Sequence, residues 1–206
     1  MNILFEPSRA EGKIPAPPSK SLSHRAVLSA LLSHGVSRIE NAFFSEDIRT
    51  MADAAEVLGA GTIYEGRTLT VKGNRGQLPK GDLTLDARES GSVMRFLIPL
   101  MWLREGRTEI LGTQRLLKRP LTVYEDIAKE QGLLFEIKED RVITEGGLKP
   151  GLFHVRGDIS SQFITGLLFA LPLLQEDSTI RFTTRVESFP YMELTRWFLK
   201  DFGIVS

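Results

Sequence analysis

The sequence has no cysteine, which excludes disulfides, thiolate metal ligands and cysteine nucleophiles. None of its three histidines has a second histidine at metal-ligand spacing, so we expect no bound metal. With 26 basic and 26 acidic side chains there is no net charge to attract nucleic acid or a membrane surface. No apolar run reaches the roughly 18 residues that span a bilayer. We therefore expect a cytoplasmic protein without nucleic-acid or membrane partners.

A chain of 206 residues, 42% of them hydrophobic, can bury one sizeable core or two small ones. Its most informative stretch is Pro17–Arg25, where a proline-rich segment becomes an amphipathic helix. Free N–H groups at a helix start attract anions, and Lys20 and Arg25 add full charges there. An ordinary serine cap on a core helix would have a similar sequence, so this stretch alone does not distinguish an anion site from a helix cap.

The sequence repeats this pattern, which favours the anion site. Segments 89–95 and 158–162 also open helices after a strand, and Arg95 stands where Arg25 stands. Gly59, Gly132 and Gly203 recur at nearly equal intervals, each where a helix end needs the left-handed conformation. Three similar units are therefore predicted, at about 15–75, 82–147 and 151–206.

Each unit is predicted to run strand, helix, strand, helix, hairpin. The third unit has no room for its hairpin, so we expect the sequence to be part of a longer protein. Pro120 is predicted at a helix start, where its missing N–H costs nothing, and Trp102 and Trp197 are expected in the core. The expected helices are 21–33, 46–58, 91–104, 120–131, 160–174 and 190–202; the expected strands are 36–41, 62–64, 68–71, 83–85, 108–111, 134–137, 141–144, 153–155 and 179–183.

Two further polar loops precede second helices. One carries Arg115, Lys118 and Arg119 just before Pro120. The equivalent loop of the third unit offers Arg185, Ser188 and Tyr191. A solvated basic loop is one interpretation of the first. The other is that Arg119 presents its planar donor fork to a carboxylate or phosphate. Taken together, the helix-opening loops are predicted to converge on one concave anion site.

At these residues the sequence resembles the 5-enolpyruvylshikimate-3-phosphate synthases, also named 3-phosphoshikimate 1-carboxyvinyltransferases. The resemblance covers the whole chain and rests on four motifs. It implies an α/β (α+β) lobe, a pseudo-threefold repeat of βαβαββ units with buried helices and outer sheets, the third unit truncated. Residues 1–14 would belong to the other lobe, residues 15–206 would form the substrate-binding lobe, and the C-terminal lobe is missing. The motifs are residues 18–25, 89–95, 118–120 and 157–163.

The resemblance also implies a reaction and a site. The enolpyruvyl group of phosphoenolpyruvate would pass to the 5-hydroxyl of shikimate 3-phosphate, in the shikimate pathway of aromatic amino-acid biosynthesis, without any cofactor. The residues implied to face phosphoenolpyruvate are Lys20, Gly91, Arg119 and Gln162. Those implied to hold shikimate 3-phosphate are Ser21, Arg25, Ser160, Ser161, Gln162, Ser188 and Tyr191.

The sequence departs from the family pattern at Glu89, where many members carry asparagine, and at Phe96, where proline is common. In the family the general acid and base come from the other lobe, so the isolated chain is expected to bind shikimate 3-phosphate without turnover. Three alternatives stay open. They are a UDP-N-acetylglucosamine enolpyruvyl transferase, many of which use a cysteine; an RNA 3′-phosphate cyclase; and a non-catalytic binding module.

Overall fold

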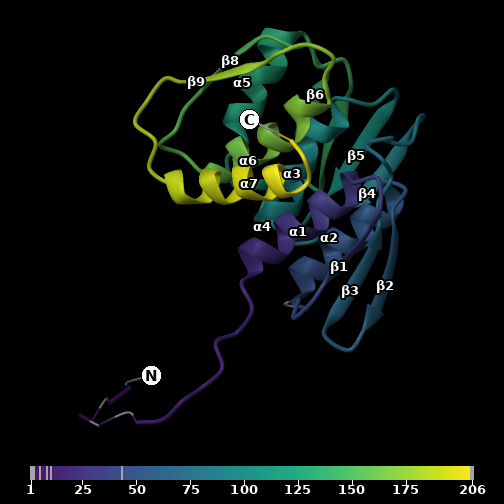
Figure 1. Ribbon diagram of the computed structural model, residues 1–206. Helices are drawn as coiled ribbons and strands as arrows, with labels where there is room; N and C mark the ends of the chain where they lie inside the picture. The colour runs from purple at the N-terminus through teal and green to yellow at the C-terminus, as the bar shows by residue number, and fades with distance from the viewer. Residues whose placement is uncertain (1–2, 5, 8, 10, 43, 205–206) are drawn as a thin grey trace.

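A computed structural model of the protein describes residues 3–4, 6–7, 9, 11–42 and 44–204 (Figure 1). Its strands form three separate sheets of three, four and two strands. The predicted mixed α/β fold class is confirmed.

The first sheet is antiparallel and packs against two helices. Its order is β1-β3-β2, so the hairpin returns its second strand beside β1. Gly66, at φ 58°, opens the two-residue hairpin loop, a position that needs glycine. The elements are α1 (Lys20–Leu32), β1 (Val36–Ile39), α2 (Glu46–Val57), β2 (Gly61–Glu65) and β3 (Thr68–Lys72).

The second sheet has the order β4-β5-β7-β6, with β4 and β5 parallel and the other pairs antiparallel. Leu85, Ile110 and Val142 lie side by side across three strands and are all buried, so one face of the sheet covers the core. The elements are β4 (Leu83–Asp86), α3 (Gly91–Met101), β5 (Arg107–Leu111), α4 (Gln114–Leu117), α5 (Thr122–Gln131), β6 (Phe135–Ile137) and β7 (Arg141–Glu145).

The third sheet consists of two parallel strands joined through a helix. Its order of strand, helix, strand and helix is that of the second unit without the short helix α4 and the β6–β7 hairpin, which is consistent with the predicted repeat. The elements are β8 (Leu152–Val155), α6 (Ser161–Ala170), the 3₁₀ turn η1 (Leu171–Leu173), β9 (Thr179–Phe182) and α7 (Phe189–Asp201).

Helices α3 and α6 pack together in the interior. Every residue of α3 except Ser92 is buried, and so are eight of the ten residues of α6. Where they cross, the Tyr124 hydroxyl of α5 donates to the backbone carbonyl oxygens of Arg95 and Phe163. The apolar helix α6 is therefore buried on nearly all sides.

The three predicted glycine stops follow the second helix of each unit. Gly59, Gly132 and Gly203 have φ values of 94°, 69° and 84°, in the left-handed region that favours glycine. These are the sharpest local predictions that the structure confirms.

Two predicted boundaries around the basic loop are wrong. Helix α5 begins at Thr122, not at Pro120, and residues 114–117 form the short helix α4 instead of a loop. Thr113 explains α4, because its hydroxyl accepts a hydrogen bond from the Leu116 N–H and caps a turn of helix.

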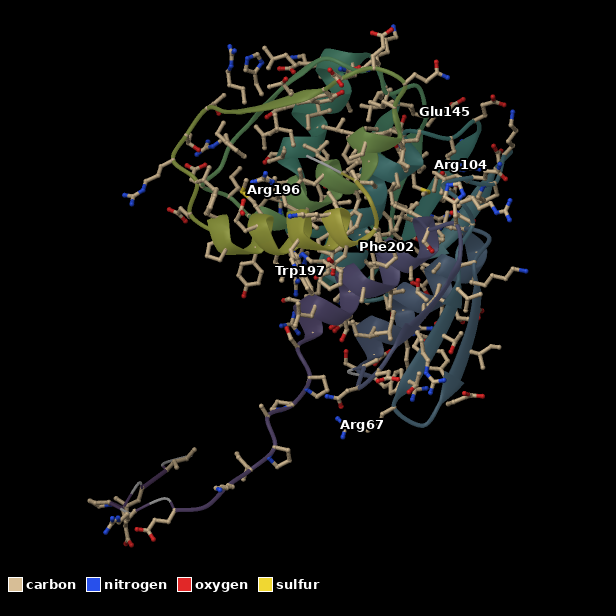
Figure 2. The ribbon with its side chains drawn as sticks, viewed as in Figure 1. Arg67, Arg104, Glu145, Arg196, Trp197 and Phe202 are labelled. Atoms are coloured by element: carbon tan, nitrogen blue, oxygen red, sulfur yellow. The ribbon has the colours of Figure 1, made fainter. Side chains whose placement is uncertain are left out.

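Two expectations for the third unit are also wrong. The helix expected to reach residue 174 ends at Ala170 in a 3₁₀ turn, because Pro172 has no N–H to continue the α-helical pattern. Trp197 lies on α7 (Figure 2) with 53% of its surface exposed, whereas Trp102 is completely buried as expected. Apolar character alone did not show which face of α7 is covered.

The described residues before Ser19 form no helix or strand, and this segment runs away from the body of the protein (Figure 1). The assignment of residues 1–14 to another lobe stays a prediction, and positions 1, 2, 5, 8 and 10 lie outside the described residues. Every helix in the described chain is too short or too polar to cross a membrane.

Gly166 lies at the crossing of α3 and α6, and replacing it tests that packing. A Cβ there would collide with the Arg95 carbonyl oxygen and the Tyr124 hydroxyl. We expect Gly166→Ala to lower the free energy of unfolding by about 1–3 kcal/mol, because the overpacking exceeds the helix-propensity gain. Urea denaturation measures this. Gly35→Ala, where a Cβ meets open space, is the control and should change stability by less than about 0.5 kcal/mol. Equal stabilities of the two variants would contradict the close crossing.

Candidate functional site

Most of the sequence-predicted ligand residues surround one cavity of about 310 Å³. Its walls come from the first two turns of α1, α3, α6 and α7, and from the residue that caps α6. Four helix N-termini pointing at one space favour an anion, through their free N–H groups and their dipoles. The lining residues are Ser21, His24, Arg25, Ser92, Phe96, Ser160, Ser161, Gln162 and Tyr191.

Serine side chains cap three of these helices. Each cap oxygen accepts a hydrogen bond from a backbone N–H of the first turn, which fixes the direction of the helix axis. A serine cap therefore begins the first helix of each of the three units. The pairs are Ser19–Leu22, Ser90–Val93 and Ser160–Gln162.

Arg25 is almost completely buried, with 3% of its surface exposed. Its guanidinium donates to the hydroxyl oxygens of Thr195 at 2.8 Å and Thr165 at 3.0 Å. It also donates to the backbone carbonyls of Ser21 and Tyr191. Arg25 thereby ties α1 to α6 and α7. Burial lowers the pKa of Arg25 to about 10, with Tyr191 opposing the shift, so the group is charged at neutral pH.

Arg95 holds the amide of Gln162. It donates to Gln162 Oε1 at 2.8 Å and to the Pro120 carbonyl at 3.2 Å, while Gln162 Nε2 donates to Ser92 Oγ at 2.9 Å. These contacts fix which end of the amide faces Arg95. The remaining N–H of Nε2 is then a donor for an oxygen in the cavity.

Gly91 leaves room for two neighbouring cations. A Cβ at this position would lie 2.9 Å from Nη1 of Arg95 and 3.1 Å from Nη1 of Arg119. Burial lowers the pKa of Arg95; Tyr124 opposes this shift and Arg119 adds to it. The two arginines make a second positive region beside the cavity.

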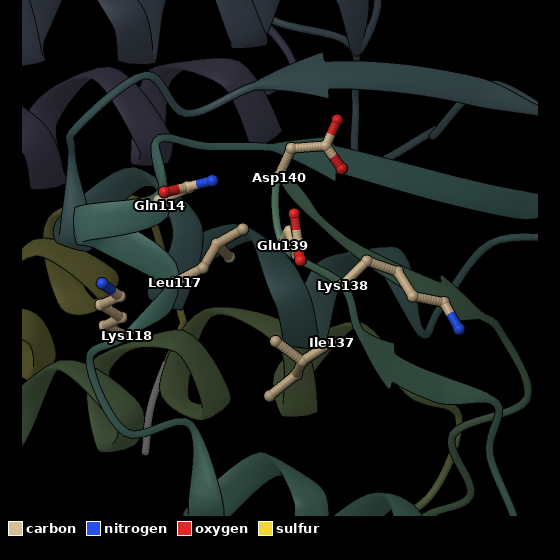
Figure 3. Close-up of a pocket in the computed structure, with 7 residues that line it drawn as sticks. All are labelled: Gln114, Leu117, Lys118, Ile137, Lys138, Glu139 and Asp140. Atoms are coloured by element: carbon tan, nitrogen blue, oxygen red, sulfur yellow. The ribbon is translucent and has the colours of Figure 1, made fainter.

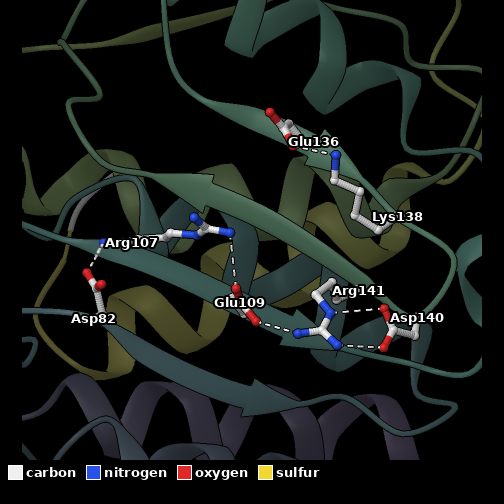
Figure 4. Close-up of polar contacts among 7 residues, drawn as sticks. All are labelled: Asp82, Arg107, Glu109, Glu136, Lys138, Asp140 and Arg141. Carbon is white, nitrogen blue, oxygen red and sulfur yellow. Dashed lines mark hydrogen bonds and ion pairs between the residues drawn. The ribbon is translucent and has the colours of Figure 1, made fainter.

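Several other arginines form ion pairs with carboxylates, whereas the buried Arg104, outside the cavity, donates to neutral oxygens. On the outer face of the second sheet, Arg141 pairs with Glu109 at 2.6 Å and Asp140 at 2.7 Å (Figure 4). Within the described part of the chain, neither Arg25 nor Arg95 contacts a carboxylate. A buried charge without a counter-ion is costly. An anion in the cavity would supply the missing counter-charge.

Lys20 does not line the cavity and instead forms an ion pair with Asp47 of α2. Burial would raise the pKa of Asp47, but hydrogen bonds from Lys20 and Ser90 outweigh it and the pKa is lowered. Asp47 thus links the starts of α1, α2 and α3, and it balances the charge of Lys20.

His24 lines the cavity with 1% of its surface exposed, and in the described chain neither ring nitrogen has a hydrogen-bond partner. Its ring stands edge-on to Phe96, with centroids 6.1 Å apart. Burial lowers the pKa of His24 to about 4; Asp47 opposes the shift, and Lys20 and Arg25 contribute to it. The imidazole is therefore neutral at neutral pH.

The structure brings together all the residues predicted for shikimate 3-phosphate except Ser188, which is not part of the lining. Of the residues predicted for phosphoenolpyruvate, Gln162 lines the cavity. Gly91 and Arg119 lie next to Arg95, whose side chain donates to Gln162. Lys20 is held at Asp47.

Sequence reasoning did not assign a site role to Arg95, His24, Asp47, Thr165 or Thr195. The repeat contained a signal for Arg95, which stands where Arg25 stands. The two threonines lie inside helices with no local mark of function. Only tertiary packing brings them to Arg25.

The two departures from the family pattern differ in position. Glu89 is exposed in the loop before α3. Phe96 is buried and lines the cavity, with the Arg25 guanidinium carbon 5.5 Å from its ring centroid. Phe96 therefore contributes to the cavity wall through a cation–π contact.

A larger hollow of about 740 Å³ lies between α4 and the turn that joins β6 to β7 (Figure 3). It is open and carries both signs of charge, with Lys118 and Lys138 opposed by Glu139 and Asp140. None of these charges is buried. The smaller cavity, with its buried cations, is therefore the better candidate site.

A model of the EPSP synthase (3-phosphoshikimate 1-carboxyvinyltransferase) family matches residues 5–205. The chain belongs to the EPSP synthase family. The chain is 44% identical over 214 residues to the 3-phosphoshikimate 1-carboxyvinyltransferase of Clostridioides difficile (strain 630), covering 98% of this chain and 49% of that protein. It is 42% identical over 204 residues to the protein of that name from Clostridium perfringens (strain ATCC 13124), covering 98% and 48%.

The fold is similar to a solved EPSP synthase from Acinetobacter baumannii. The TM-score is 0.73 at 20% sequence identity, over 88% of this chain and 42% of that one. The chain thus spans about half the length of the EPSP synthases that it matches.

The buried neutral His24 makes stability depend on pH. The unfolded chain binds a proton at His24 below about pH 6.5, whereas the folded chain does so only below about pH 4, so the unfolded state gains on acidification. We expect the free energy of unfolding to fall by about 3 kcal/mol across this window because of His24. Urea titrations of the unsubstituted chain and of His24→Leu, at several pH values, measure the difference. Parallel pH curves for the two proteins would contradict the neutral buried state.

Proposed function

We propose that the chain is the shikimate 3-phosphate-binding part of an enzyme that transfers the enolpyruvyl group of phosphoenolpyruvate to the 5-hydroxyl of shikimate 3-phosphate. Membership in the EPSP synthase family supports the reaction class. The observation that carries the proposal is a cavity where four helix N-termini meet beside two buried arginines that contact no carboxylate of the described chain. This arrangement suits a phosphorylated substrate.

The two anionic substrates would occupy different sides of the site. Arg25, with Ser21, Ser161 and Tyr191 around it, would face the phosphate and ring oxygens of shikimate 3-phosphate. Phosphoenolpyruvate would lie nearer Gly91, where Arg95 and Arg119 are adjacent. Lys20, the first residue of α1, would add a further positive charge on that side. Gln162, held by Arg95, would donate to an oxygen where the two substrates meet.

In the proposed reaction the substrate 5-hydroxyl loses its proton to a base as its oxygen bonds to C2 of phosphoenolpyruvate, and the C2–C3 double bond opens as C3 gains a proton. Loss of phosphate from C2 and of a proton from C3 then gives the enolpyruvyl ether. This chain would position both substrates and balance their charge. The cavity lining has no carboxylate, and its one imidazole is a weak base because the pKa of His24 is lowered to about 4. The proton-transfer groups would therefore come from the other lobe.

Binding to the 206-residue chain tests the first half of this proposal. We expect calorimetry to show weak binding of shikimate 3-phosphate. Arg25→Met, which keeps the apolar stem but removes the charge, should weaken binding by about 10- to 100-fold, the loss expected for a hydrogen bond to a charged group. Arg141→Met removes an ion-paired arginine from the outer sheet and should bind like the unsubstituted chain. A folded chain that binds nothing at millimolar ligand would refute the proposal.

Turnover tests the second half. With both substrates present, the chain alone should release no phosphate above the uncatalysed rate, because the acid and base are absent from the cavity lining. Adding the part of the Clostridium perfringens relative that lies beyond the matched half should restore some phosphate release. Robust turnover by the 206-residue chain alone would show that its own residues transfer the protons.

A further inference from the structure

His24 is a buried polar group in the cavity that the proposed reaction does not use. With 1% of its surface exposed, it has no hydrogen-bond partner at either ring nitrogen within the described chain. Buried polar side chains nearly always have partners. His24 lines the cavity with both ring nitrogens covered, so a molecule bound there would reach them through a small movement of the neighbouring side chains.

The chemistry around His24 selects the kind of group that would bind it. A neutral imidazole has one N–H donor and one acceptor nitrogen. A phosphate oxygen can satisfy only the donor, and it is better served by Arg25, the next residue. A hydroxyl is both donor and acceptor, so it matches a neutral imidazole in either tautomer.

We propose that His24 binds a ring hydroxyl of the phosphorylated substrate and so contributes to specificity for the hydroxylated ring rather than for phosphate. This inference rests on the proposed function, because it takes the cavity to be the shikimate 3-phosphate site. Phe96 supports the geometry: its edge-to-face contact at 6.1 Å holds the imidazole plane, while the guanidinium carbon of Arg25 lies 5.5 Å from the centroid of the same ring. The Phe96 ring thus orients both His24, which would bind the hydroxyl, and Arg25, which would bind the phosphate.

The substitution His24→Leu separates this role from a structural one. Leucine removes both polar nitrogens without leaving a large void. If His24 serves only packing, the variant should lose stability and bind every ligand less well. If His24 binds a hydroxyl, the variant should be at least as stable at neutral pH, since unpartnered buried polar atoms are removed, yet bind the substrate more weakly.

The experiment compares two ligands by calorimetry, shikimate 3-phosphate and inorganic phosphate. For His24→Leu we expect about three- to tenfold weaker binding of shikimate 3-phosphate, the loss of one neutral hydrogen bond, with phosphate binding unchanged. His24→Asn keeps a donor and an acceptor and should recover part of the affinity. His154→Leu removes an exposed histidine of β8 outside the cavity and serves as the control.

Nitrogen NMR of the imidazole gives a direct second measurement. The His24 signals are identified by their absence in His24→Asn. Shikimate 3-phosphate should shift the ring nitrogens towards a single neutral tautomer, while inorganic phosphate should leave them nearly unchanged.

Four outcomes would overturn the inference. Equal shikimate 3-phosphate affinity of His24→Leu and the unsubstituted chain overturns the His24 assignment alone, as does a parallel loss of both ligands. If the folded, unsubstituted chain binds shikimate 3-phosphate no better than phosphate, the ring is not recognised and the assignment fails, while an anion site remains. If it binds neither ligand, the proposed function falls as well.

Discussion

A buried guanidinium without a carboxylate partner is the constraint on which the site depends. Arg25 donates to Thr165, Thr195 and the Tyr191 carbonyl, so the same charge that would attract a ligand also joins α1 to α6 and α7. Its hydrogen bonds go to neutral oxygens, which satisfy the donors but leave the charge uncompensated. The contacts that join these helices would therefore also preorganise the cavity for an anion.

Core packing also fixes the residues on the other side of the cavity, Arg95 and Gln162. Gly166 lets α6 approach α3 closely enough for the Tyr124 hydroxyl to bond both the Arg95 and Phe163 carbonyls. These hydrogen bonds fix the backbone of Arg95 and of Phe163, the residue directly after Gln162. The bond between Arg95 and the Gln162 amide thus rests on a rigid crossing of two buried helices rather than on mobile loops.

Much of this could be predicted from the sequence, because the repeat showed where equivalent elements lie. The left-handed glycines after the second helices are local signals and are present as predicted, and serine side chains cap the starts of α1, α3 and α6. What failed depended on longer-range or competing effects. Thr113 caps a short helix where a loop was expected, and Trp197 lies on a half-exposed face of α7. The partners of Arg25 come from α6 and α7, so no local pattern could identify them.

The two sides of the cavity differ in how much positive charge remains for a ligand. Lys20 is balanced by Asp47, and that carboxylate is held in its charged form because hydrogen bonds from Lys20 and Ser90 outweigh the effect of burial on its pKa. Arg25 has no such partner in the described chain. An anion approaching the Lys20 side must compete with an existing ion pair, whereas one approaching Arg25 gains the charge interaction in full. The Arg25 side would therefore attract an anion more strongly than the Lys20 side, and a ligand near Lys20 would gain most if it also contacted Arg95 and Arg119.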